Sequence, residues 1–170
     1  METQKKRDAS RLYGVMLLLA AVVLLVDQLS KLWAVSALSD SERIAVVPPL
    51  IHFRLLYNPG AAFSIGTGAT WVFTLTAAAA VAGILYTARR LNSASWALAL
   101  GALLGGAVSH LGDRLFREPG PARGHVVDFI DYGPFVGNVA DIALVCGCAA
   151  LVLLNLRGIH LAKTPSEESA

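Results

Sequence analysis

Four long apolar stretches dominate this sequence and limit what it can fold into. An α-helix needs about 20 apolar residues to cross a lipid bilayer, and each stretch comes close to that length. We expect membrane-spanning helices over residues 12–35, 70–88, 96–112 and 135–156. The third stretch is the shortest and the richest in glycine, and the spacing of Gly101 and Gly105 favours close helix packing. The sequence therefore predicts an all-α membrane protein with a single membrane-embedded domain over residues 1–170.

The composition separates the chain from ordinary soluble domains. Charged residues make up 15% of the sequence and hydrophobic residues 55%, whereas a soluble domain carries about 25% charged residues. A net charge of only +2 indicates no basic surface for nucleic acid. Cys146 and Cys148 lie two positions apart in one apolar run. They would point to different faces of a helix, so we expect no disulfide between them.

The lysines and arginines predict which side of the membrane each loop faces. The tails 1–11 and 157–170, together with the Arg89-Arg90 turn, carry eight of the basic residues and a net charge of +4. The segments 36–69 and 113–134, with the adjoining span ends, carry six basic residues and a net charge of −2. We therefore expect both tails to be cytoplasmic and both segments to be extracytoplasmic. Charges near the end of the first span argue against a cleavable signal peptide, so we expect that span to be retained.

The first external segment has the pattern of a small sheet. Residues 44–47 and 51–57 read as two short strands on either side of Pro48-Pro49. The turn signal Asn58-Pro59-Gly60 follows the second strand. We expect a small extracytoplasmic β-sheet at the outer membrane interface.

Two acidic residues near the outer boundary are the strongest candidates for chemistry. Asp128 is flanked by apolar residues, and Asp141 follows Asn138 by three positions near the start of the fourth span. The thirteen-residue separation, with Gly133-Pro134 between them, lets the chain fold back and bring both carboxylates together. Two carboxylates in a partly desolvated site share a proton, so one can activate water while the other donates a proton. This pair predicts amide hydrolysis without a metal, although the helix dipole alone also favours an acid at Asp141.

Other polar residues near the spans have structural interpretations. Asp27 and Lys31 are four residues apart, so they face each other on a helix, and we interpret them mainly as an ion pair. Asp113 and Arg114 close the third span, and Arg114 either meets a substrate carbonyl or lipid headgroup or reaches the phosphate layer. The sequence has no HExxH motif, and its histidines are scattered, so we expect no metal and no other cofactor. Ser64 lies in a motif one glycine short of GxSxG.

Five motifs together resemble bacterial signal peptidase II, the prolipoprotein signal peptidase family. They occur in the family's order within residues 15–155: Asp27-Gln28-Leu29-Ser30-Lys31, Asn58-Pro59-Gly60-Ala61-Ala62-Phe63, Gly105-Gly106-Ala107 through Asp113-Arg114, Gly124-His125-Val126-Val127-Asp128-Phe129, and Asn138-Val139-Ala140-Asp141. The resemblance implies a four-helix aspartic endopeptidase of the bacterial inner membrane. Such an enzyme removes the signal peptide of diacylglyceryl-modified prolipoproteins by cutting before the lipidated cysteine.

The resemblance also implies roles for individual residues. Asp128 and Asp141 would be the catalytic pair. Substrate would be bound or oriented by Asn58, Gly60, Arg114 and Asn138, and the region would be supported by Asp27, Lys31, Asp113 and Ala140. The implied partners are a lipidated prolipoprotein and membrane lipids, and we favour a monomer.

The chain departs from the family motifs at two places. Ser109-His110 stands where the family has Gly-Asn, which puts a titratable group near the acids. Gly137 stands where the family has phenylalanine, and we expect it to weaken the start of the fourth helix. These departures leave a non-catalytic paralogue that binds signal helices as one alternative. A small proton-coupled transporter is another, although transport sites usually lie near the middle of the membrane.

Overall fold

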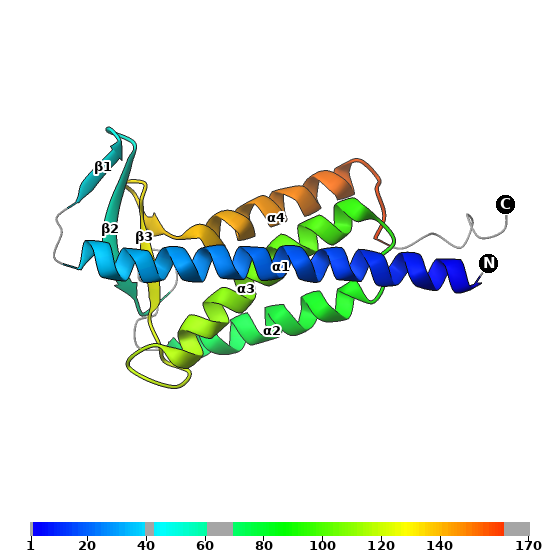
Figure 1. The fold of residues 1–170 in the computed structure, drawn as a ribbon, viewed down its shortest axis with the longest axis horizontal. Helices are drawn as coiled ribbons and strands as arrows, with labels where there is room; N and C mark the ends of the chain where they lie inside the picture. The colour runs from blue at the N-terminus through cyan, green and yellow to red at the C-terminus, as the bar shows by residue number, and fades with distance from the viewer. Residues whose placement is uncertain (1, 40–42, 61–69, 162–170) are drawn as a thin grey trace.

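Four long helices lie together and carry a small β-sheet at one end (Figure 1). The structure is a computed structural model that describes residues 2–39, 43–60 and 70–161. The helices are α1 (Glu2–Leu38), α2 (Thr70–Ala88), α3 (Ala94–Phe116) and α4 (Val139–Leu156). Each is long and apolar enough to cross a membrane. The predicted fold class, four spanning helices with a small sheet, is confirmed.

The α3 helix forms the centre of the bundle and packs against each of the other three helices. Within its apolar window, 61% of the residues are buried inside the protein, against 11–17% in the other helices. A central helix faces protein rather than lipid, so small residues serve it better than large apolar ones. This position explains why the third span has the lowest mean hydropathy of the four, 1.4.

The glycines of α3 set how closely the helices approach. A Cβ atom on Gly101 would lie 2.8 Å from the carbonyl oxygen of Met16, and one on Gly105 would lie 2.7 Å from that of Ala20. On the opposite side, a Cβ on Gly106 would lie 2.9 Å from the carbonyl oxygen of Ala140 in α4. The predicted close packing at Gly101 and Gly105 is confirmed, with α1 as the partner helix.

The sheet is antiparallel, with its strands in the order β1 (Ile44–Val47), β2 (Ile51–Asn58), β3 (Val126–Asp131) and β4 (Val136–Gly137). The first two strands match the sequence prediction. The last two were not predicted, because β4 has only two residues and β3 is buried along nearly its whole length. Because β4 occupies residues 136–137, α4 begins at Val139, four residues after the predicted start of the fourth span. The α3 helix ends at Phe116, four residues past the predicted end of the third span.

An aromatic cluster joins the sheet to α1. The rings of Trp33, Phe53 and Phe129 meet edge to face, with centroids 5.4–6.2 Å apart. Phe129 also packs against Ala34 and Leu38 of α1. Successive side chains of a strand point to opposite faces. Because Phe129 packs against α1, the neighbouring side chain of Asp128 points to the other face of β3.

We expect the Gly105→Ala variant to lose about 1–3 kcal/mol of stability, since its new methyl group collides with backbone and a β-branched side chain of α1. Gly112→Ala on the same helix is the matched control, because a Cβ there meets nothing within 4 Å. Its stability should stay the same or rise slightly. Thermal unfolding in detergent micelles measures both, and equal melting temperatures for the two variants would contradict the packing argument.

Candidate active site

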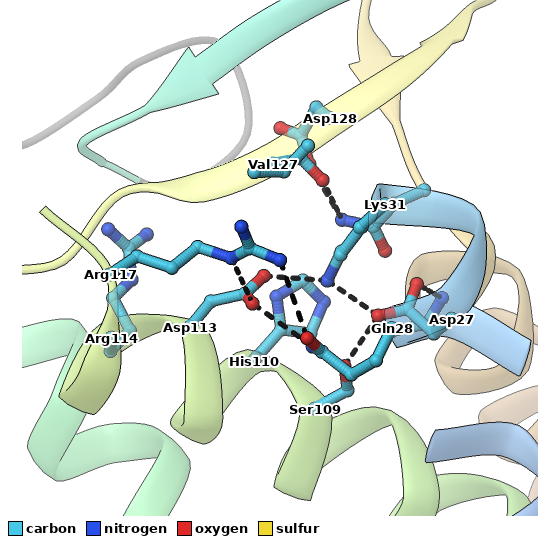
Figure 2. A network of polar contacts seen from close by, with 12 residues as sticks. Asp27, Gln28, Lys31, Ser109, His110, Asp113, Arg114, Arg117, Val127 and Asp128 are labelled. Carbon is cyan, nitrogen blue, oxygen red and sulfur yellow. Dashed lines mark hydrogen bonds and ion pairs between the residues drawn. The ribbon is translucent and has the colours of Figure 1, made fainter. Parts of the chain in front are cut away.

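A buried ammonium group lies between two buried carboxylates where α1 and α3 meet the sheet (Figure 2). Lys31 Nζ lies 2.6 Å from Asp27 Oδ2 and 2.7 Å from Asp113 Oδ2. The side chains of Lys31 and Asp27 have no exposed surface. The expected pairing of Asp27 with Lys31 is present, and both side chains are buried within the protein.

Polar side chains to which the sequence analysis assigned no role complete this network. Gln28 Nε2 donates to Asp113 Oδ1 at 3.0 Å and to Ser109 Oγ at 2.8 Å. The Ser109 hydroxyl donates in turn to Asp27, and Arg117 Nε donates to Asp113 Oδ1 at 2.7 Å. Only the i,i+4 spacing of Asp113 and Arg117 is visible in the sequence, because the other contacts join residues more than 80 positions apart.

The network extends to the first turn of α4. Asp27 Oδ1 accepts a hydrogen bond of 2.8 Å from the backbone N–H of Ala140, which is fully buried. A helix leaves its first N–H groups without partners inside the helix, so a carboxylate placed there stabilises the helix start. Asp27 therefore fixes the backbone beside Asp141.

A reciprocal cap orients Asp141. The Asn138 side chain accepts from the N–H of Asp141 at 3.0 Å, and Asp141 Oδ2 accepts from the N–H of Asn138 at 2.9 Å. This capping box satisfies two backbone donors at once. The helix-start interpretation of Asp141 is thus correct, and the cap also holds its carboxylate in one orientation.

Asn138 also connects the cap to the second acid. Its side-chain nitrogen donates to Asp128 Oδ1 at 2.7 Å and to the carbonyl of Val127 at 3.3 Å. One residue therefore contacts the carboxylates of both Asp128 and Asp141. The Asp128 and Asp141 carboxylates, which the sequence analysis expected to lie together, are thus linked through Asn138.

The register of the sheet brings Asn58 to Asp128. Asn58 pairs with Val126 and Leu56 pairs with Asp128 on the antiparallel strands β2 and β3. Asn58 and Asp128 are therefore diagonal neighbours on one face, within reach of each other. The Asn58 side-chain nitrogen donates to Asp128 Oδ2 at 2.9 Å, and its oxygen accepts from the N–H of Gly60 at 3.0 Å.

Arg114 lies at the cavity and is held in place by backbone groups of its own chain. Its side chain is buried and donates to the carbonyls of Asn58 and Gly124 at 3.1 Å, and also to that of Gly60. Its guanidinium lies 5.7 Å from the ring centre of Phe73. The expected contact with the phosphate layer is incorrect, because backbone carbonyls surround the charge. Arg114 instead holds the strand end that carries Asn58 and Gly60.

The two acids differ in exposure. Asp128 is 2% exposed, and burial raises its pKa to about 6, with the nearby Asp141 charge adding to the rise. The amide donors of Asn58 and Asn138 oppose that rise, since they stabilise the carboxylate form. The Asp141 side chain is 38% exposed. Asp128 is thus the acid that solvent reaches less easily.

Both acids open onto one cavity of about 440 Å³ between the sheet and the helices. The ionisable and amide side chains of the lining are Asn58, His110, Arg114, Asp128 and Asp141. Most of the remaining wall is apolar and comes from α2, α3 and α4, including Phe73, Ala77, Ala80, Ala107, Leu144 and Val145. The cavity can hold an apolar chain and present its polar end to two carboxylates.

The two motif departures both lie beside Asp141. His110 Nε2 lies 3.1 Å from Asp141 Oδ1, so the expectation of a titratable group near the acids is met. A Cβ on Gly137 would lie 2.9 Å from Asp141 Oδ2. Gly137 belongs to β4 and precedes the helix cap, so the expectation that it weakens the fourth helix is wrong.

Residues 61–63 of the second motif and Ser64 lie outside the described residues. Among residues 2–39, 43–60 and 70–161, no group of three histidine, cysteine or acidic side chains is arranged to hold a metal ion. Cys146 and Cys148 are free and exposed on α4.

Solved structures of similar fold come from bacterial membrane enzymes studied by the in meso method. One, at 1.9 Å resolution, has 25% identity, a TM-score of 0.73, and alignment over 84% of this chain and 93% of the other. Another, at 2.3 Å resolution, has 24% identity and the same TM-score, over 85% and 88% of the two chains. The latter similarity supports the fold alone.

Sequence comparison extends the similarity from fold to family. Residues 19–157 match the family described as signal peptidase (SPase) II. A lipoprotein signal peptidase of Mycolicibacterium smegmatis is 45% identical over 158 residues, covering 92% of this chain and 67% of the relative. Those of Leifsonia xyli subsp. xyli and Mycobacterium tuberculosis are 43% and 47% identical, covering 87% and 85% of this chain and 71% and 72% of the respective relatives. The chain is therefore a multi-pass bacterial membrane protein and belongs to the signal peptidase II family of aspartic peptidases.

Proposed function

We propose that this chain cleaves the signal peptide from diacylglyceryl-modified prolipoproteins, just before the lipidated cysteine, with Asp128 and Asp141 as its catalytic residues. The observation that carries the proposal is the position of Asn138. It contacts both carboxylates at the polar end of an otherwise apolar cavity. The acids lie beside the sheet at one end of the bundle, which fits a peptidase better than a transporter with a site in the middle of the membrane.

The two carboxyl groups supply both proton transfers that amide hydrolysis needs. One carboxylate takes a proton from water as the water oxygen bonds to the scissile carbonyl carbon, and the other carboxyl group gives its proton to the carbonyl oxygen. The resulting gem-diol collapses when its C–N bond breaks and the nitrogen takes up a proton. The products are a carboxylic acid and an amine, and the pair again holds one shared proton.

The remaining residues hold the acids and the substrate in place. Asn58 and Asn138 orient the Asp128 carboxyl group through one hydrogen bond each. Arg114 fixes the backbone at Asn58 and Gly60, and Asp27 fixes the backbone at Ala140. The apolar wall of α2, α3 and α4 suits the apolar signal peptide, which would lie along the small side chains of the cavity.

We place the sheet and the two acids at the extracytoplasmic face of the membrane. The first residues of α1, the α2–α3 turn and the end of α4 all lie at the opposite end of the bundle (Figure 1). That end carries Arg89 and Arg90, as the positive-inside rule requires for the cytoplasmic side.

Replacing either acid with its amide should abolish cleavage. In Asp128→Asn and Asp141→Asn the proton transfers are lost, so we expect the rate to fall by at least about 100-fold. The measurement is cleavage of a lipidated precursor in detergent or vesicles, followed by gel shift. Asp131→Asn is the matched control on the same strand as Asp128, because Asp131 pairs with Arg43 and Arg54 and does not line the cavity. Full activity in either test variant would refute the assignment.

The stability of the protein should fall as the pH rises through the titration of Asp128. Its pKa of about 6 in the folded state exceeds the ordinary value of 3.8, so the folded protein binds more protons than the unfolded one between these values. Stability from this group is present at low pH and is lost as the pH rises through 6. The loss between pH 5 and pH 8 is about 1.4 kcal/mol.

Comparing the pH dependence of thermal stability in the wild type and in Asp128→Asn isolates the contribution of Asp128 titration. Melting temperatures measured from pH 5 to pH 8 should decline more steeply in the wild type, because the variant lacks the titrating group. Asp131→Asn should retain the wild-type slope. Parallel curves for wild type and Asp128→Asn would show that burial does not control the pKa of this acid.

The orientation can be tested with single cysteines in a Cys146→Ser, Cys148→Ser background. Arg123→Cys lies in the exposed segment before β3, and Asn92→Cys lies in the exposed turn between α2 and α3. A membrane-impermeant maleimide should label position 123 in intact cells and position 92 only after permeabilisation. The reverse pattern would place the acids on the cytoplasmic side.

A further inference from the structure

Asp141 is contacted at one oxygen by a side chain that the family motif does not carry. His110 lies 3.1 Å from Asp141 Oδ1, and its side chain is 19% exposed. The other oxygen, Oδ2, accepts from the N–H of Asn138 and lies so close to Gly137 that a Cβ on that residue would be 2.9 Å away. An ionised carboxylate can only accept hydrogen bonds, so the imidazole donates from Nε2 when Asp141 is ionised. His110 and the Asn138 backbone thus hold the two oxygens separately.

The donors to the two acids differ in kind. Asp128 is buried and meets two neutral side-chain amides, from Asn58 and Asn138. Asp141 is more exposed and meets an imidazole, whose N–H becomes a charge-assisted donor when the ring is protonated. A carboxylate with access to water is placed to accept a proton from it, whereas a buried carboxyl group retains its proton more readily.

We propose that His110 is a positioning residue that fixes Asp141 as the base toward water and leaves Asp128 as the proton donor to the substrate carbonyl. This division of labour rests on the proposed function. The proton of water passes to Asp141 Oδ as the C–O bond forms. The Asp128 proton passes to the carbonyl oxygen, which gives a gem-diol. As the C–N bond breaks, the proton held by Asp141 passes to the nitrogen, and one gem-diol hydroxyl returns its proton to Asp128, which restores the starting state of the pair.

The charged groups around His110 come from every side except α2. Asp141 faces it from α4, Asp128 from β3 and Arg114 from the next turn of α3. The Lys31 cluster, the ion-paired group of Asp27, Lys31, Asp113 and Arg117, lies toward α1. The α2 helix contributes uncharged cavity residues, among them Phe73 and Thr76. Burial raises the pKa of Asp128, and the charge of His110 works against that rise. Removing His110 should therefore raise the pKa of Asp128.

Two substitutions separate hydrogen bonding from charge. His110→Leu removes the donor, so we expect kcat for precursor cleavage to fall about 10- to 100-fold with KM unchanged. His110→Asn keeps an N–H donor of similar reach, so its kcat should stay within a few-fold of wild type. It removes the titrating ring, so the alkaline limb of its kcat/KM profile, where Asp128 loses its proton, should move to higher pH.

His160→Asn is the matched control, since His160 is exposed beyond the end of α4 at the far end of the bundle. Its kcat and pH profile should match those of wild type. Melting temperatures of all variants in detergent exclude a loss of fold as the cause. If His110→Leu keeps the wild-type kcat, or if the alkaline limb of His110→Asn does not move, the positioning role is overturned while the peptidase assignment stands.

Difference infrared spectroscopy tests the division between the acids without measuring activity. At pH 5 the wild type should show a protonated carboxyl band that is absent in Asp128→Asn and present in Asp141→Asn. The opposite pattern would overturn the division. A wild-type chain that cleaves no lipidated precursor would overturn the proposed function, and the inference with it.

Discussion

The charge of Lys31 between Asp27 and Asp113 is the interaction on which the rest of the site depends. An unpaired charge is very unfavourable inside a membrane protein, and removing one member of a buried pair typically costs about 3–5 kcal/mol. Here the ammonium group of Lys31 bridges the carboxylates of Asp27 on α1 and Asp113 on α3, and Arg117 supplies the second positive charge at Asp113. The second oxygen of Asp27 then holds the backbone of α4 at Ala140. Three helices are therefore fixed relative to one another within a few ångströms of the candidate catalytic acids.

The orientation of those acids follows from ordinary rules of secondary structure. Asp141 faces the cavity because it is the third residue of a capped helix, and Asp128 faces it because strand side chains alternate. Asn138 belongs to both arrangements, since its backbone and side chain cap α4 while its side-chain nitrogen contacts Asp128. A change at Asn138 would consequently disturb the helix start and the acid pair together.

The sequence predicted features that depend on local spacing and missed those that depend on distant contacts. The spans, the first two strands and the Asp27–Lys31 pair each follow from hydropathy or periodicity. The environment of Arg114 could not be predicted, because its partners are backbone carbonyls, which every residue carries and which no sequence pattern reveals. Gln28 and Ser109 were seen only as parts of motifs, and their contacts were missed because their partners lie on another helix. His110 was noticed as a departure from a motif, but only the fold shows that Asp141 is its neighbour.

The site combines two environments that oppose each other. An apolar signal peptide requires a cavity with an apolar wall, yet hydrolysis requires water and a carboxylate that is ionised. The two environments lie at different places in one cavity. Asp128 lies on the buried side, where desolvation favours its proton-bound form, and Asp141 lies on the more exposed side, next to the helix start and His110. The same burial that keeps a proton on Asp128 lowers the stability of the folded protein at neutral pH, so the fold needs compensating interactions close by. The Lys31 cluster and the cap of α4 are the interactions that the structure places there.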